Sequence, residues 1–132
     1  SACAVQAPPR ATTATLPRAF EGRYLWAESA TASGYRVTLA IETATSARAG
    51  APIAVHGTIA YQPGDNHMTI DGNVDPVTLQ VRLRESAPSQ PDAVTAGAFT
   101  GALSSDLRSL VAIWRSDTDG RLGALVLRTC GQ

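Results

Sequence analysis

The sequence predicts an all-β fold, in which eight strands form an antiparallel meander that closes into a small barrel or a barrel-like sandwich. Three observations support this expectation. From Phe20 onward, apolar or glycine residues occupy every second position of successive segments. Residues that favour turns separate these segments. The spacing between them suits hairpins and leaves no room for crossover helices.

Each of the eight segments places its alternating apolar residues on one face, so we expect one buried and one solvated face per strand. In chain order the segments run from Phe20 to Trp26, Tyr35 to Ile41, Ile53 to Tyr61, Met68 to Val74, Leu79 to Leu83, Gly97 to Leu103, Leu110 to Trp114 and Leu125 to Leu127. Turn formers lie between them at Ser33-Gly34, Gln62 to Asn66, Asp75-Pro76, Ser86 to Asp92 and Asp117 to Gly120.

The segment before the first strand has a different character. Residues 1–18 contain Pro8, Pro9 and Pro17 among alanines and threonines, which excludes a regular helix or a central strand. We therefore expect an extended arm or tether over residues 1–18 and a single barrel-like domain over residues 19–132.

Charge and hydropathy exclude several function classes. The chain has 132 residues with 11 basic and 11 acidic side chains, so its net charge is zero. A nucleic-acid binder that acts through bulk charge, or a polybasic membrane-surface protein, is therefore not expected. No apolar run approaches the roughly 18–20 residues of a transmembrane helix.

All 11 basic residues are Arg, a bias that suggests a GC-rich bacterial genome.

The two cysteines lie near opposite ends of the chain, at Cys3 and Cys130. In an exported domain this placement favours a single disulfide that joins the termini. Closing so long a loop would stabilise the fold by roughly 4–5 kcal/mol. Two alternatives remain open. In the first, Ser1-Ala2-Cys3 resembles the end of a lipoprotein signal, and Cys3 carries a lipid anchor. In the second, the protein is cytosolic and both thiols are reduced.

No catalytic or metal-binding motif stands out, so we expect neither enzyme activity nor a cofactor. His56 falls on the solvated face of its strand and His67 in a turn, which makes either a poor candidate for a catalytic base. The Asp117 to Gly120 segment resembles the start of a calcium loop. The twelfth position, which should be Glu, is Arg128, so a polar turn is expected there instead.

The predicted contact surface is the loop from Tyr61 to His67, which combines an aromatic residue, a turn and polar tips. Arg82 and Arg84 project from the solvated face of a later strand and are the electrostatic candidates. An alternative places Tyr61 inward as the last residue of its strand. The predicted partner-binding residues are Tyr61, Asp65, Asn66, His67, Arg82 and Arg84.

Two motifs resemble those of small exported bacterial β-domains. Gly97, Phe99, Gly101 and Leu103 precede Leu110 and Trp114 in a G-x-F-x-G-x-L…W pattern, and Ile70 to Asp75 lead to Leu79, Leu83 and Glu85. Within that set, the chain is most similar to periplasmic lysozyme inhibitors and to immunity proteins against wall hydrolases. Some of these inhibitors carry a Ser-Gly-x-x-Tyr loop. Here Tyr35 follows Ser33-Gly34 directly, so no inhibitory loop is assigned.

The resemblance implies a periplasmic or secreted protein-binding module. Its partner would be a secreted or injected peptidoglycan hydrolase, whose cleft a loop blocks while Arg or His groups meet the acidic catalytic residues. Nucleic acid is not an expected partner. Two alternative functions are a small-ligand carrier of the lipocalin type, because alanine and glycine inside a barrel leave space, and a non-catalytic envelope-associated domain.

Overall fold

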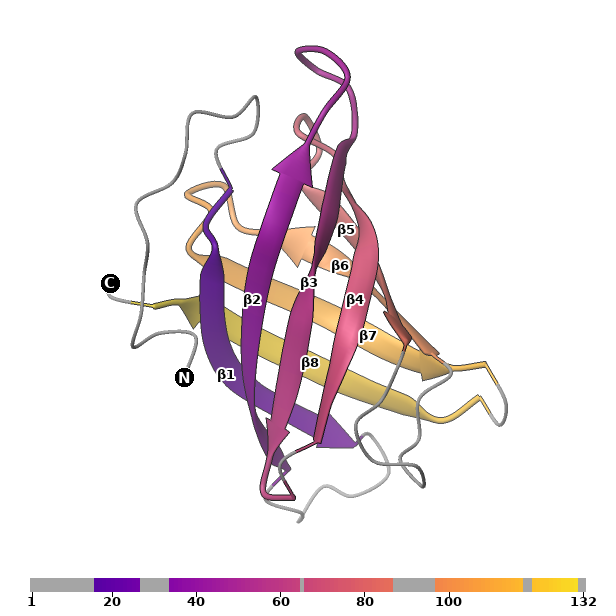
Figure 1. Ribbon diagram of the computed structural model, residues 1–132. Helices are drawn as coiled ribbons and strands as arrows, with labels where there is room; N and C mark the ends of the chain where they lie inside the picture. The colour runs from indigo at the N-terminus through magenta and orange to yellow at the C-terminus, as the bar shows by residue number, and fades with distance from the viewer. Residues whose placement is uncertain (1–15, 27–33, 65, 87–96, 118–119, 131–132) are drawn as a thin grey trace.

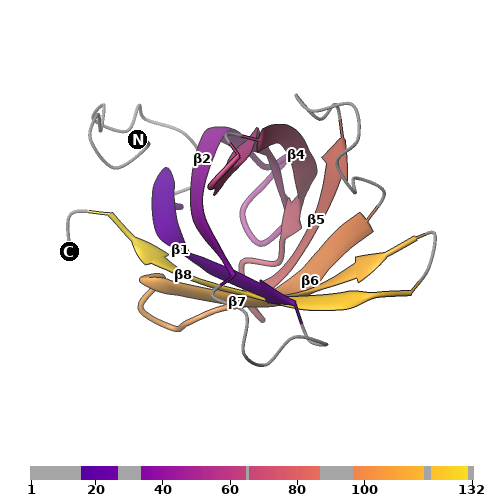
Figure 2. The ribbon, with the colours of Figure 1, turned by 90° about the horizontal axis from the view of Figure 1, so that it is seen from below.

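The computed structural model describes residues 16–26, 34–64, 66–86, 97–117 and 120–130. Eight antiparallel strands follow one another in chain order around a closed barrel (Figures 1 and 2). They are β1 (Ala19–Trp26), β2 (Tyr35–Thr45), β3 (Ile53–Gln62), β4 (Asn66–Val74), β5 (Gln80–Ser86), β6 (Gly97–Leu103), β7 (Ser109–Ser116) and β8 (Leu122–Thr129). The predicted meander is confirmed, and the sheet is a closed barrel because β1 pairs with β8.

The predicted alternation separates the interior of the barrel from its outer wall. In β5, Val81, Leu83 and Glu85 are buried, whereas Arg82 and Arg84 between them are exposed. The same pattern brings inward-facing large apolar side chains from all eight strands into a single core, whereas Leu25, Val111, Ile113 and Val126 are exposed. Fully burying one such side chain contributes about 1.5–3 kcal/mol, so this core is the main source of stability.

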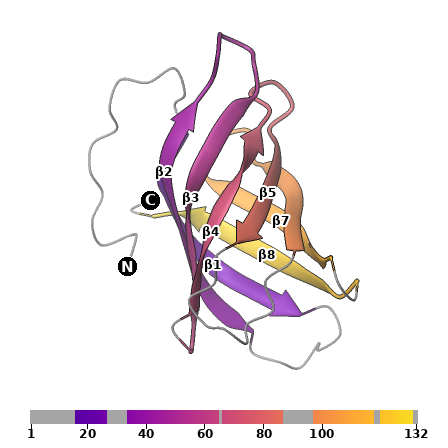
Figure 3. The same ribbon diagram turned by 45° about the vertical axis from the view of Figure 1, so that its right-hand side comes forward.

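The interior of the barrel differs between its two ends. Strands β1, β3, β5 and β7 finish at one end, which we call the aromatic end because its interior holds Tyr24, Trp26, Tyr35, Tyr61 and Trp114. At the opposite, apolar end the β2–β3 hairpin extends beyond its neighbours (Figures 1 and 3).

The described part of the predicted N-terminal arm packs against the apolar end. Leu16 is buried in the core, and the carbonyl of Arg18 accepts a 2.8 Å hydrogen bond from the backbone N–H of Ile41. A cavity of about 20 Å³ lies among these apolar side chains, and its lining includes Leu16, Phe20 and Leu103. That volume has room for about one water molecule.

The predicted turn at Asp75-Pro76 is formed by local hydrogen bonds. The carboxylate of Asp75 accepts hydrogen bonds from the backbone N–H groups of Val77, at 2.8 Å, and of Thr78, at 3.1 Å. These hydrogen bonds lower the pKa of Asp75. The turn closes where the N–H of Leu79 donates to the Asp75 carbonyl at 2.8 Å.

Within the described residues, no helix is long and apolar enough to cross a membrane.

Candidate functional site

Five aromatic side chains pack against one another inside the aromatic end. The Tyr24 ring is at the centre, with its centroid 5.2 Å from that of Trp26, 5.9 Å from Tyr61, 6.3 Å from Trp114 and 6.4 Å from Tyr35. Three of these four pairs are edge-to-face, the arrangement that the charge distribution of aromatic rings favours. We call these five residues the aromatic cluster.

A buried carboxyl group lies beside the aromatic cluster. The Glu85 side chain is only 5% exposed, and the hydroxyl of Tyr61 donates a short hydrogen bond to its Oε2. Burial raises the pKa of Glu85 to about 7, although hydrogen bonding from Tyr61 and the nearby Trp114 indole partly offsets this. Burial and the Glu85 charge together raise the pKa of Tyr61. Glu85 therefore changes its protonation near neutral pH.

Two further polar atoms in the cluster are buried without a hydrogen bond of normal geometry. They are the hydroxyl of Tyr24 and Nε1 of Trp114. Each ring lies against a glycine of a neighbouring strand, since a Cβ at Gly123 would overlap the Tyr24 ring and one at Gly97 would overlap the Trp114 indole. The glycines thus make the space in which the two rings pack, close to the backbone.

The rim of the aromatic end is partly open to solvent. Trp26 and Tyr35 are only partly buried and pack against the fully buried core residues. The guanidinium carbon of Arg121, from the chain just before β8, lies 4.3 Å from the centroid of the Trp26 ring. This cation–π contact covers one face of the indole, while Tyr24 and Trp114 pack edge-to-face against it. Trp26 is therefore held in one orientation at the rim.

The structure corrects the expected exposure of Tyr61. Its side chain is 8% exposed and points into the barrel towards Glu85, so the alternative of a last inward residue holds. The physical reason is that the alternation of inward-facing residues in β3 continues to Tyr61. The buried carboxyl group of Glu85 accepts a hydrogen bond from the Tyr61 hydroxyl there. Asn66 is half-buried and His67 is exposed, but His67 belongs to β4 rather than to a turn. Asp65 lies outside the described residues.

The structure does not bring Arg82 and Arg84 to the predicted loop. Asn73 and Asp71 of β4 pair with Arg82 and Arg84, seven and five residues beyond Asn66. At about 3.3 Å per residue, the two arginines are roughly 23 and 16 Å from the start of β4. Arg84 instead forms a 2.6 Å ion pair with Asp117. The five predicted contact residues that the structure describes therefore do not form one continuous surface.

The predicted disulfide is only half described. Cys130 is 3% exposed and follows β8, and its backbone N–H donates to the carbonyl of Ala19 at 3.1 Å. Its expected partner, Cys3, lies outside the described residues, so the bond stays a prediction.

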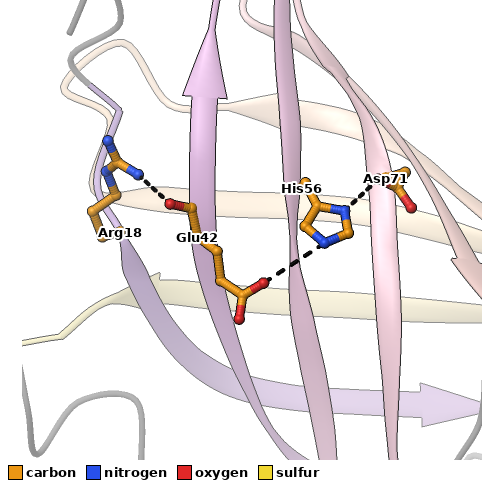
Figure 4. A network of polar contacts seen from close by, with 4 residues as sticks. All are labelled: Arg18, Glu42, His56 and Asp71. Atoms are coloured by element: carbon orange, nitrogen blue, oxygen red, sulfur yellow. Dashed lines mark hydrogen bonds and ion pairs between the residues drawn. The ribbon is translucent and has the colours of Figure 1, made fainter.

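A separate polar group lies on the outer wall of the barrel (Figure 4). Nδ1 of His56 is 2.5 Å from the carboxylate of Asp71, and its Nε2 is 3.7 Å from that of Glu42. The hydrogen bond and negative charge of Asp71 raise the pKa of His56. Its predicted solvent-facing position is confirmed. Within the described ranges, no three His, Cys, Asp or Glu side chains are arranged to hold a metal ion.

Sequence reasoning did not single out Glu85 as a buried site residue. The signal was present, because Glu85 continues the inward positions of Val81 and Leu83 at an interval of two residues. Glu is rarely buried unless another group pairs with it, so a Glu in the sequence is expected at the surface when no such partner is known. That partner, Tyr61, is 24 residues away in the sequence.

Comparisons with protein-family models, with curated proteins and with solved structures find no match for this chain.

Proposed function

We propose that this protein is a periplasmic or secreted protein-binding module, which inhibits a peptidoglycan hydrolase by docking with its aromatic end. The observation that carries the proposal is the rim formed by Trp26, Tyr35 and Arg121, which is partly open to solvent and fixed by the cluster beneath it. Trp, Tyr and Arg are the residues that most often contribute the largest share of binding energy in protein interfaces.

The packed interior supports a protein partner over a carried ligand. The apolar half of the barrel contains a cavity of only about 20 Å³, and in the aromatic half the rings contact one another at centroid distances of 5.2–6.4 Å. Small-molecule sites usually have volumes of about 300–1,000 Å³. A carried ligand of ordinary size would therefore have to displace side chains of the described interior.

A rigid rim also suits an inhibitor. Trp26 is held by Tyr24, Trp114 and Arg121, so it loses little conformational freedom on docking. A steric mechanism needs no catalytic group on this chain. The rim would cover the hydrolase cleft, and in a hydrolase that cleaves glycosidic bonds Arg121 would face the catalytic carboxylates.

The test is inhibition of cell-wall lysis, measured as loss of turbidity with a panel of a lysozyme, an amidase and an endopeptidase. The wild-type protein should slow one of them. Trp26→Ala should weaken that inhibition by about thirtyfold or more, which corresponds to about 2 kcal/mol. Arg121→Gln should weaken it too, without removing a core ring. The matched control is Arg108→Gln, at the apolar end, which should inhibit like the wild type.

Two results would contradict the proposal. One is the absence of inhibition with every hydrolase of the panel. The other is full inhibition by both Trp26→Ala and Arg121→Gln, with melting temperatures that show the variants to be folded.

A second candidate is the lipocalin-type carrier, favoured by the buried hydroxyl of Tyr24, for which the described structure shows no hydrogen-bond partner. Buried polar groups are usually paired, so a small polar ligand beside Glu85 would supply a hydrogen-bond partner for the Tyr24 hydroxyl. Native mass spectrometry of the purified protein tests this. A bound small molecule that Glu85→Gln releases would favour the carrier, and bare protein would count against it.

A further inference from the structure

Most of the exposed large apolar side chains of this protein lie together on one outer wall of the barrel. Among the described residues, five such side chains are exposed, and one of them, Val77, lies outside the strands. The others, with exposed fractions of 41–53%, are Leu25 in β1, Val111 and Ile113 in β7, and Val126 in β8. Strands β6, β7, β8 and β1 lie side by side there (Figure 2), and we call their outer face the apolar wall.

The strand register makes these side chains neighbours. Val111 of β7 is directly opposite Val126 of β8, and Ile113 is opposite Ala124. On the other side of β8, Leu25 of β1 is also opposite Ala124. Directly opposed side chains have Cβ atoms about 4.5–5.5 Å apart, so these positions form one continuous apolar surface. Single exposed apolar residues are normal, but a continuous patch usually marks an interaction site.

Charged side chains lie around the margin of the apolar wall. Arg128 and Glu21 are opposite each other near the apolar end, and Arg115 is near the aromatic end. Arg23 borders the patch on β1 and already has an interaction partner within the chain. On the other margin, β6 has the sequence GAFTGAL and contributes no charge. An apolar centre with a polar margin is the usual arrangement of a protein interface.

The apolar wall is complementary to itself. A two-fold axis parallel to the strands, between β7 and β8, would place β7 of each copy over β8 of the other. Val111 would then face Val126 of the second copy, and Ile113 would face the small Ala124, because each pair lies at the same level of the barrel. Leu25 would face β6, whose outward residues are small. Two sheets that pack face to face interdigitate in this way.

The same axis is compatible with the charges at the margin. Arg115 would lie over Leu122 of the second copy and Arg128 over Ser109, so neither arginine would directly face a like charge. Both are at the ends of the wall, where the aliphatic part of an arginine covers apolar surface while its guanidinium stays in water. The net charge of the chain is zero, so two copies do not repel each other as a whole.

The size of the apolar wall fits a weak dimer. Four strands spaced by about 4.8 Å, with about seven residues of each at roughly 3.3 Å per residue, cover roughly 450 Å². Two copies would bury roughly 900 Å² before the relief of the side chains is counted, which is the size of weak, reversible interfaces. A membrane fits less well, because the outward positions of the described strands of this wall carry none of the aromatic residues that anchor proteins at membrane interfaces.

We infer that two copies of this chain form a symmetric dimer through their apolar walls, with β7 of each copy over β8 of the other. The valine and isoleucine side chains of the wall are of the type that packs well on the surface of a β-sheet. The dimer would cover the outer wall and leave the interior of the aromatic end open, so this inference does not depend on the proposed function.

The test is sedimentation velocity of the purified protein at concentrations from about 5 to about 500 µM, a range chosen for micromolar affinity. The average mass of the wild type should rise from that of one chain towards that of two. Val111→Asp should raise the dissociation constant at least about tenfold, because a carboxylate would be buried in the interface without a partner. Val111→Thr, which keeps the shape of the side chain, should raise it by about fivefold.

The matched control is Val77→Asp, the same change at an exposed apolar residue outside the wall. It should dimerise like the wild type, and melting temperatures should show that all variants are folded. The inference is wrong if the wild type remains monomeric at the highest concentration, or if folded Val111→Asp dimerises like the wild type. Equal weakening by Val77→Asp would also overturn it. A monomer that binds phosphatidylglycerol vesicles through Val111 would assign the wall to lipid instead.

Discussion

Replacing Glu85 with Gln should remove a pH dependence of stability that the buried carboxyl group imposes. In the folded protein, burial raises the pKa of Glu85 from 4.5 to about 7. The unfolded chain therefore releases this proton near pH 4.5, whereas the folded chain keeps it until about pH 7. Between these values the folded state binds more protons, so the free energy of unfolding falls as the pH rises. Gln has nearly the same shape and does not titrate.

The size of the effect follows from the difference between the two pKa values. The contribution of Glu85 to stability is fully present below pH 4.5 and is lost as the pH rises through about 7. The loss corresponds to roughly 3 kcal/mol at most. For a chain of this length, that is a change in melting temperature of roughly 10 °C. Relative to the wild type, Glu85→Gln should gain this amount of stability between pH 4.5 and pH 8.

The assay is urea unfolding of both proteins at half-unit steps from pH 4.5 to 8, followed by circular dichroism. The quantity of interest is the difference in unfolding free energy between Glu85→Gln and the wild type. His56, whose pKa is also raised, contributes in the same direction. It lies on the outer wall and is present in both proteins, so its contribution cancels in the difference. A His56→Gln series provides the control, since it should leave the Glu85 contribution in place.

A difference curve that is flat from pH 4.5 to 8 would refute this reasoning. It would mean that Glu85 titrates at the same pH in the folded and the unfolded chain, and so that the carboxyl group is not desolvated at the aromatic end. If the unfolding free energy of Glu85→Gln fell relative to that of the wild type as the pH rises, the reasoning would be refuted more strongly. That result would mean that folding favours the charged form of Glu85.

Three further predictions concern packing, the disulfide and metals. Gly97→Ala should lower the free energy of unfolding, measured in urea, by about 1–3 kcal/mol, because the added methyl group overlaps the Trp114 indole. Unchanged stability together with an unchanged near-ultraviolet spectrum would contradict this. Intact mass after alkylation without reductant should show no modified thiol if Cys3 and Cys130 are bonded, and two modified thiols would disprove the bond. Chelation should leave the melting temperature unchanged, whereas a clear decrease would contradict the interpretation of Asp117 to Gly120 as a polar turn without a metal.

The sequence alone was sufficient for the fold class and for the direction of most side chains. The alternation from Phe20 to Trp26, for example, placed Phe20 and Tyr24 inside the barrel, and the structure agrees. The exposed positions of His56 and Arg82 followed from the same rule. In a strand, the direction of a side chain depends only on whether its position is odd or even, so it can be read from local sequence.

The candidate sites required the tertiary structure, because each depends on residues that are distant in the sequence. Glu85 has a partner in Tyr61 only because β3 and β5 face the same interior across the barrel. Trp26 meets Arg121 because β1 closes the sheet against β8. Register and closure are set by the packing of the whole sheet rather than by any one segment. The sequence therefore determined the direction of most side chains, with Tyr61 as an exception, and only the folded barrel decided which of them meet.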